Sequence, residues 1–215
     1  MKNKYINNAE LNKFYYSSKN VIMREIKGVN KKILDVGCNE GYFGKNNFEK
    51  SNQYYGLDLL ADAVDVAKNN YKEAYVYDLE NLKPLEFEVD KFDYIVFGDV
   101  LEHIKNPTEV LKFFAEKYLE KDGKVIISLP NVANWQIRLK LLFGNFDYTD
   151  RGILDNTHLK LYTFKSATSL VNFSNLKTKK ILYGANIFGY LISFLPFLRN
   201  ILSTNIVLVC SNYIK

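Results

Sequence analysis

The chain contains two histidines, His103 and His158, and each stands close in sequence to acidic residues. An imidazole with its ordinary pKa of about 6.5 is partly unprotonated near neutral pH, so a histidine can take the proton of an attacking hydroxyl group. Asp155 and Asp147 precede His158 and can orient its ring or hold neighbouring hydroxyls. We therefore predict His158 and Asp155 as catalytic residues, with His103 as the next candidate. In the alternative interpretation, His158 only ties its own segment down through hydrogen bonds.

The segment around His158, residues 130–163, is too long for a simple connection between a strand and a helix. We interpret it as an insertion over the strand ends, where open α/β sheets bind their substrates. An arginine in this segment can bind a phosphate through two parallel hydrogen bonds, and its carboxylates can hold hydroxyl groups. The residues expected to bind the substrate are Arg138, Asp147, Arg151 and Asn156.

A second candidate site lies near the start of the chain, in the stretch KILDVGCNEGYFG at residues 32–44. A short apolar run reaches an acid and then turns on two glycines into a segment that can start a helix. Glycine at a strand exit allows the backbone to approach a ligand closely. The residues of this loop expected to bind a ligand are Asp35, Gly37, Cys38, Asn39 and Gly41.

The charges of this loop discriminate between two classes of ligand. A dinucleotide fingerprint needs Gly-x-Gly-x-x-Gly, with a pyrophosphate at the helix N-terminus. Here Asn39 stands at the second glycine position, and Glu40 places a carboxylate where a phosphate would have to sit. Like charges at that range oppose binding. A ligand that carries positive charge, such as the sulfonium and ammonium groups of S-adenosylmethionine, tolerates both Asp35 and Glu40.

Apolar patterns predict the elements that position these residues. Helices are expected within residues 8–27, where they cap the ligand site, and near 42–50, 61–70, 107–119, 138–142 and 164–172. Strands are expected at 33–36, 53–58, 74–77, 92–98, 124–129, 177–183 and 205–210. The alternation of strands and helices, with a buried strand at 92–98, favours an α/β fold with a mainly parallel sheet. We expect one domain over residues 1–215, with residues 1–30 as its N-terminal helical cap.

Three strings carry a resemblance to a known family. DVGCNEG, at residues 35–41, resembles the first motif (D-x-G-x-G-x-G) of the class I S-adenosylmethionine-dependent methyltransferases, with Asn39 in place of the middle glycine. DVLEHIKNP, at residues 99–107, closely resembles a later motif of the same class. The string from 129 to 164 resembles bacterial methyltransferases that accompany surface-polysaccharide and glycan biosynthesis. The resemblance covers roughly residues 30–175.

The resemblance implies a Rossmann-like three-layer sandwich whose seven-stranded sheet is mostly parallel and ends in an antiparallel C-terminal strand. It also implies roles for residues at the strand ends. Asp58, with Leu59 beside it, would accept hydrogen bonds from the ribose hydroxyls, a role that the fold also favours. Asp78 and Leu79 would bind the adenine, and Asp99 and Val100 the methionine end. In the alternative interpretation, Asp58 only stabilises the N-terminus of the following helix, and Asp78 only starts a turn.

The function implied is S-adenosylmethionine-dependent O-methylation of a sugar, sugar nucleotide or glycan-linked group. A quinone-type or other small-molecule O-methyltransferase is the alternative of the same class. An NAD(P)-binding oxidoreductase and a non-catalytic cofactor-binding subunit are the alternatives of other classes, and Glu40 argues against the oxidoreductase. Asp99, Glu102 and His103 share one face of a helical turn and could bind a divalent metal, as in some quinone-type enzymes. We expect no metal, because many relatives carry this motif as plain structure.

Composition limits the partners. Residues 151–215 contain eight basic residues and one acidic residue, a charge of +7, so the first 150 residues carry −2 of the net +5. A basic C-terminal portion suits an anionic acceptor or an anionic membrane surface, whereas the absence of a dense Lys/Arg run argues against nucleic acid. The first residues lack the apolar core of a signal peptide, which favours the cytoplasm. The apolar stretch within 185–202 favours a packed or dimer-forming helix, with peripheral contact at the inner face of the membrane as the alternative.

Overall fold

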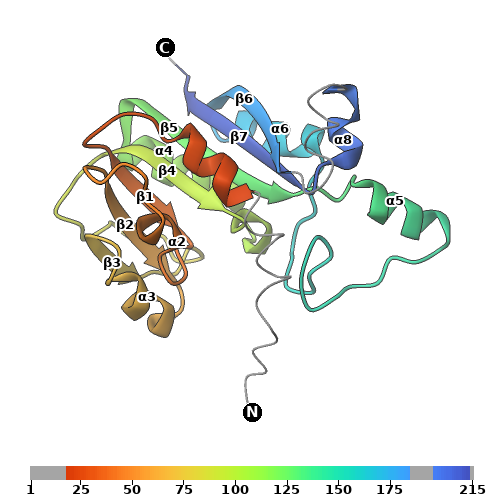
Figure 1. The fold of residues 1–215 in the computed structure, drawn as a ribbon, viewed down its shortest axis with the longest axis horizontal. Coiled ribbons are helices and arrows are strands. Elements are labelled where there is room, and N and C mark those ends of the chain that lie inside the picture. Colours follow the sequence, from red (N-terminus) through yellow and green to blue (C-terminus); the bar gives the residue numbers. More distant parts are fainter. Residues whose placement is uncertain (1–17, 185–195, 214–215) are drawn as a thin grey trace.

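The structure, a computed structural model, describes residues 18–184 and 196–213 (Figure 1). One seven-stranded sheet runs through it in the order β3-β2-β1-β4-β5-β7-β6. The strands are β1 (Lys32–Val36), β2 (Gln53–Asp58), β3 (Glu73–Val76), β4 (Phe92–Gly98), β5 (Leu119–Pro130), β6 (Leu176–Gly184) and β7 (Asn205–Asn212). The first five strands are parallel, and β7 pairs antiparallel with both β5 and β6. The predicted Rossmann-like fold is therefore confirmed, with β7 as its reversed strand.

Helices cover both faces of the sheet. They are α2 (Tyr42–Lys45), α3 (Ala61–Ala67), α4 (Pro107–Tyr118), α5 (Trp135–Leu142), α6 (Phe164–Phe173) and α8 (Arg199–Leu202), with 3-10 turns η1 (Leu101–His103) and η2 (Pro196–Leu198). A further helix occupies residues 18–25. Successive strand residues face opposite sides, so Leu34 packs with α4 and α6 while Ile33 packs with α3 and the helix at 18–25. Two apolar cores thus hold three layers together.

Two predicted helices end earlier than the sequence suggested. The helix expected over 42–50 is the single turn α2, and the helix expected over 61–70 ends at Ala67. After α2, the Asn46 side chain donates to the carbonyl of Tyr42 at 2.8 Å, and the Asn47 side chain accepts from the amide of Glu49 at 3.1 Å. Asparagine side chains that bond to nearby backbone compete with helical hydrogen bonds, which accounts for the early end of α2.

The register of the parallel strands determines where the site forms. Val36 at the end of β1 lies opposite Leu57 of β2 and Phe97 of β4. The residues that follow these three strands therefore meet at one edge of the sheet. Residues 131–163 contain α5 and an irregular stretch that extends to one side of the sheet in Figure 1.

Two predictions fall wholly or partly outside the described residues. Of the N-terminal cap predicted for 1–30, residues 1–17 are outside, and the helix at 18–25 packs its Ile22 and Met23 against the core. Of the apolar stretch within 185–202, residues 185–195 are outside. Among the residues that the structure describes, no helix combines the length and apolar character needed to cross a bilayer.

Candidate active site

A cavity of about 620 Å³ opens at the carboxyl ends of β1, β2, β3 and β4. Ten of the predicted cofactor residues line it: Asp35, Gly37, Cys38, Asn39, Asp58, Leu59, Asp78, Leu79, Asp99 and Val100. Such a position, outside the carboxyl ends of parallel strands, is where open α/β sheets bind their ligands. The topology therefore brings together residues that are spread over 66 positions of the sequence, from 35 to 100.

Gly37 makes the sharp turn at the end of β1. Its φ is +78°, and a Cβ there would lie 2.2 Å from Cγ2 of Val100. Its amide and that of Cys38 donate to the carbonyl of Leu57 at 2.7 and 3.0 Å, which ties the loop to β2. We expected this glycine to allow a close approach to a ligand. Gly37 does line the cavity, and the space that a Cβ would take is filled by Val100.

Asn39 and Gly41 show how the loop tolerates its missing glycine. Asn39 has φ of 47°, in the left-handed region that asparagine adopts more readily than most residues, and its amide donates to the Asp58 carboxylate at 2.8 Å. Gly41 has φ of +80°, and its Cβ would lie 3.0 Å from Cα of Ala67 on α3. Gly41 does not line the cavity, so its predicted ligand contact is corrected to a packing role between the loop and α3.

The cavity is acidic. Asp35 is buried and accepts a hydrogen bond from the hydroxyl of Tyr71 at 2.5 Å, and burial raises the pKa of Asp35 to about 7. Lys19, from the helix at 18–25, also lines the cavity; burial lowers its pKa, while Asp35 and Asp99 act in the opposite direction. Asp58 accepts hydrogen bonds from the amides of Asn39 and Leu60, at 2.8 and 3.0 Å. Such a site favours a ligand with positive charge over a pyrophosphate.

Asp99 is held at the junction of three elements. Its carboxylate accepts hydrogen bonds from Ser128 of β5 at 2.7 Å, Asn205 of β7 at 2.9 Å and Ser18 at 3.3 Å. Burial raises the pKa of Asp99, and the hydrogen bonds from Ser128 and Asn205 oppose that effect. The metal-binding alternative grouped Asp99 with Glu102 and His103. The structure instead groups Glu102 and His103 with His158, with candidate ligand atoms all within 4.8 Å of one another.

A second, smaller cavity of about 70 Å³ adjoins the first and shares two residues with it, Asp99 and His103. Its other lining residues are Glu102, Pro130, Gly152, Asp155, His158 and Asn205. All three predicted catalytic residues, His158, Asp155 and His103, therefore meet at one place. Because His103 belongs to both cavities, a group bound in the large cavity can face the small one there.

His158 is only 6% exposed at its side chain. Its Nδ1 lies 3.1 Å from the carbonyl oxygen of Ile153. A carbonyl only accepts, so Nδ1 carries the hydrogen and Nε2 has a free lone pair in the neutral ring. Burial lowers the pKa of His158, which favours that neutral form. Its Nε2 lies 3.9 Å from Oε1 of Glu102, whose pKa is raised well above its usual range by burial and by the charge of Asp99.

Asp155 reaches the other histidine. It accepts a hydrogen bond from Thr157 Oγ1 at 2.6 Å, and His103 Nδ1 lies 3.1 Å from that hydroxyl and 3.2 Å from the Thr157 carbonyl. Burial alone would raise the pKa of Asp155, but the hydrogen bonds from Thr157 lower it. We predicted that Asp155 orients His158; in the structure the Ile153 carbonyl takes that position, and Asp155 acts on His103 through Thr157.

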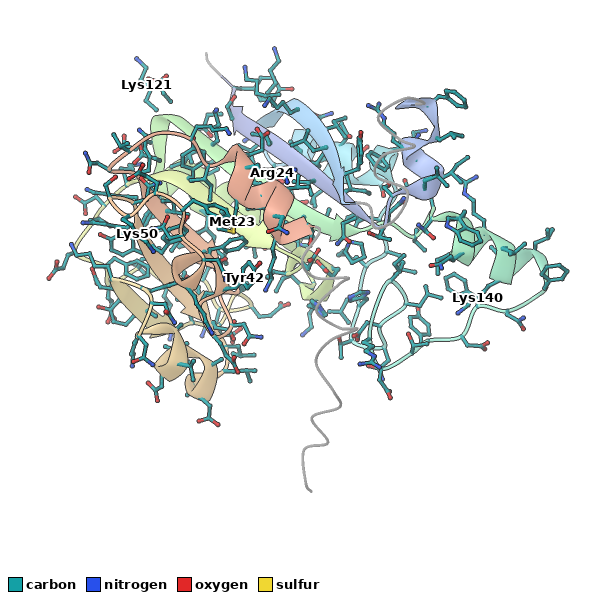
Figure 2. All side chains as sticks on the ribbon, viewed as in Figure 1. Met23, Arg24, Tyr42, Lys50, Lys121 and Lys140 are labelled. Atoms are coloured by element: carbon teal, nitrogen blue, oxygen red, sulfur yellow. The ribbon has the colours of Figure 1, made fainter. Side chains whose placement is uncertain are left out.

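The predicted substrate residues do not join this cluster. Arg138, Asp147, Arg151 and Asn156 are all exposed, and none of them lines either cavity. Arg138 lies on α5, where its Nε donates to the carbonyl of Ala133 at 2.7 Å. Figure 2 shows the neighbouring Lys140 on α5, to the side of the sheet. Arg151 lines a separate groove with α5. Their prediction followed from their place in the segment 130–163, interpreted as an insertion over the strand ends; the irregular path of this segment instead carries them away from both cavities.

Several site residues were not predicted. Lys19, Tyr42, Phe43 and Thr157 line the large cavity, and Tyr71, Ser128 and Asn205 hold its acids. Thr157 could have been found from its place directly before His158. Tyr42 and Phe43 directly follow Gly41 in the ligand loop, so their place in the chain could also have indicated them. Nothing in the sequence near Lys19, Tyr71, Ser128 and Asn205 distinguishes them, because each reaches the site from an element distant from the loop in sequence.

Comparisons with known proteins identify the family of the chain. Residues 13–178 match the family described as Methyltransferase domain. The chain is 32% identical over 112 residues to the tRNA U34 carboxymethyltransferase of Sulfurimonas denitrificans, covering 50% of this chain and 38% of that protein. It is 27% identical over 126 residues to the ubiquinone biosynthesis O-methyltransferase of Coxiella burnetii, covering 57% and 53%. The chain thus spans about half or less of the length of these curated relatives.

Solved structures share the fold at low identity. The magnesium protoporphyrin IX methyltransferase of Synechocystis, solved with bound SAH, has a TM-score of 0.66 and 13% identity, with 99% of this chain and 90% of that one covered. The PH0226 protein of Pyrococcus horikoshii has a TM-score of 0.63 and 19% identity, with 97% and 94% covered.

Proposed function

The chain belongs to the methyltransferase domain family, with the fold of the class I S-adenosylmethionine-dependent enzymes, and on that premise we propose that it methylates a hydroxyl oxygen where its two cavities meet. The observation that carries this proposal is the sharing of Asp99 and His103 between an acidic cavity of about 620 Å³ and a histidine-lined one of about 70 Å³. The first is large enough for a nucleoside cofactor, and the second can activate an acceptor.

The cofactor lies in the large cavity in this proposal. Its sulfonium and ammonium groups are near Asp35 and Asp99, whose charge they balance. The ribose hydroxyls donate to Asp58 at the end of β2, as in related α/β folds. The adenine lies by Asp78 and Leu79 after β3. The alternative oxidoreductase would place a pyrophosphate against these same carboxylates, which the charge of the cavity opposes.

The acceptor approaches from the small cavity. The methyl group moves from the sulfonium sulfur to a hydroxyl oxygen, so the enzyme must align the oxygen with the methyl and help the oxygen lose its proton. His103, His158 and Asp155 are the groups available for this at the junction. A non-catalytic cofactor-binding subunit would have no use for their convergence.

We propose a sugar, sugar nucleotide or glycan-linked group as the acceptor. Two features support it: the resemblance of residues 129–164 to methyltransferases of glycan biosynthesis, and the charge of +7 over residues 151–215, which suits an anionic acceptor at a membrane face. A quinone-type small molecule is the second candidate, favoured by the similarity to the ubiquinone biosynthesis O-methyltransferase of Coxiella burnetii.

Calorimetric titration with S-adenosylmethionine, S-adenosylhomocysteine and NADH tests the cofactor assignment. We expect the first two to bind and NADH to give no heat. Asp58→Ala removes the two carboxylate oxygens that accept hydrogen bonds from the ribose hydroxyls in this proposal. It should weaken the binding of S-adenosylmethionine by about 10- to 100-fold. Asp62→Ala, which removes an exposed acid from the first turn of α3, serves as the matched control. Binding of NADH alone would refute the proposal.

Methyl transfer to sugar nucleotides and to catechols, measured with radiolabelled cofactor, tests the acceptor. His158→Gln should abolish transfer while leaving the affinity for S-adenosylmethionine unchanged, because His158 does not line the large cavity. Unchanged transfer in this variant would contradict the role of the histidine cluster and favour the cofactor-binding subunit.

A further inference from the structure

Glu102 is the least accounted-for charged group of the site. Its side chain is 1% exposed, and neither of its oxygens accepts a hydrogen bond from any residue that the structure describes. A buried carboxylate without donors is costly unless it binds a proton or a cation. Its neighbour Asp99, by contrast, accepts hydrogen bonds from three donors. Glu102 lines the small cavity, so its unpartnered oxygens face the site.

The two histidines present matching atoms to this carboxylate. Each uses Nδ1 toward an acceptor, the Ile153 carbonyl for His158 and the Thr157 carbonyl for His103. Each therefore keeps the lone pair of Nε2 in its neutral form. The rings are 4.8 Å apart at their centroids. Two imidazole nitrogens and one carboxylate, with room left for other ligands, are a donor set typical of divalent first-row transition metals.

The surroundings of the histidines favour ligation over proton transfer. Histidines that bind metals usually donate their second N–H to a carbonyl or carboxylate, which fixes the ring and the tautomer. His158 has such a partner in Ile153, and His103 has one in Thr157, which donates in turn to Asp155 at 2.6 Å.

We propose that Glu102, His103 and His158 bind one divalent first-row cation, of the Mn²⁺, Fe²⁺, Co²⁺ or Zn²⁺ type, at the wall of the small cavity. Two of the ligands come from η1, directly after β4, and the third comes from the segment 131–163. The cation therefore links that segment to the sheet edge. This link predicts that cation binding stabilises the folded chain, since the unfolded chain does not hold the three ligands together.

The consequence for catalysis rests on the proposed function, whereas cation binding does not. A hydroxyl bound to a divalent cation loses its proton far more readily than a free hydroxyl. The proton passes to solvent water, and the oxygen takes the methyl group from the sulfonium. In this arrangement the cation replaces direct proton transfer to His158, and the preferred acceptors are those that offer two neighbouring oxygens to it.

The test uses the full chain without a histidine tag, stripped with a chelator and titrated with Co²⁺, with no cofactor or acceptor present. We expect one Co²⁺ to bind, with the visible absorption of Co²⁺ in a protein site and a rise in melting temperature. Loss of a supporting residue costs about 10- to 100-fold in metal affinity, so loss of a ligand in Glu102→Gln or His158→Gln should cost at least about 100-fold. Asp62→Asn is the control and should bind as the parent does.

Two results would overturn the site: no Co²⁺ spectrum in the parent, or the same affinity in the parent and in both ligand variants. Glu102→Gln keeps the size of the side chain, and its melting temperature without Co²⁺ reports whether it folds. If it does not fold, the same comparison is made with His158→Gln. If methyl transfer is lost on chelation and restored by Mn²⁺, the catalytic role of the cation is supported. If transfer is undiminished in the presence of chelator, the catalytic role is refuted, and the Co²⁺ titration alone decides whether the cation site exists.

Discussion

Replacing Gly37 by alanine isolates the contact that shapes the ligand loop. Gly37 and Gly144 have the same φ of +78°, but a Cβ on Gly37 would lie 2.2 Å from Cγ2 of Val100, whereas one on Gly144 meets nothing within 4 Å. Both replacements incur the cost of an alanine in the left-handed region, about 1–2 kcal/mol. Only Gly37→Ala adds an overlap, and overpacking typically costs about 1–3 kcal/mol. We therefore expect a loss of about 1–2 kcal/mol for Gly144→Ala and about 2–5 kcal/mol for Gly37→Ala.

Val100→Ala completes a double-mutant cycle with Gly37→Ala. It removes the atom that would overlap and leaves the Val100 Cβ at 3.4 Å, so the double variant should recover the overlap cost but not the conformational cost. The two changes should be coupled by about 1–3 kcal/mol, favourably in the double variant. This coupling depends on geometry alone and does not require the cofactor.

Urea unfolding of the four variants and the parent measures these differences in the free energy of unfolding. An unchanged dependence of that free energy on urea concentration shows that the folded and unfolded states are comparable among the variants. Equal losses for Gly37→Ala and Gly144→Ala would refute the close approach of Val100. Strict additivity of Gly37→Ala and Val100→Ala would refute it independently.

Two further predictions concern stability. Burial raises the pKa of Asp35 from 3.8 to about 7, so between these pH values the folded chain holds a proton that the unfolded chain has lost. The free energy of unfolding without cofactor should therefore fall as pH rises through this window, by at most about 4 kcal/mol. Urea titrations at each pH should show a smaller fall for Asp35→Asn. Phe114 is 0% exposed and Phe143 is 73% exposed. In the same assay, Phe114→Ala should lower the free energy of unfolding by about 3–5 kcal/mol and Phe143→Ala by less than about 0.5 kcal/mol. Similar losses would contradict the burial of α4 against the sheet.

Local sequence was sufficient for the sheet and for about half of the residues that line the large cavity. The nearly all-apolar run at Phe92–Gly98 predicted β4 with the bounds that the structure has, because a strand buried on both faces needs a nearly continuous apolar sequence. The acids at the strand ends could be grouped in advance because parallel neighbours end at the same edge. The acidic residues of the loop at 35–41 by themselves favour a cationic cofactor over a pyrophosphate.

Local sequence was less reliable where a residue's role depends on a distant neighbour. Gly41 looked like a ligand contact, but its space is limited by Ala67 on α3. Arg138 and Arg151 were predicted as substrate contacts because an arginine in an insertion over the strand ends can bind a phosphate, but neither lines either cavity. The pairing of His158 with Glu102 across 56 positions had no local signal.

The sequence by itself thus determined the fold, the cofactor class and the strand ends that line the large cavity, because short-range periodicity and backbone conformation specify strands, helices and tight turns. Only the tertiary structure decided how the acceptor side is built. The segment 131–163 has no sustained period, and its path depends on long-range contacts such as the two hydrogen bonds from the amides of Leu159 and Lys160 to the Glu102 carbonyl, at 2.8 and 3.0 Å. Those contacts bring His158 beside Glu102 and His103, and they exist only once the sheet edge has formed.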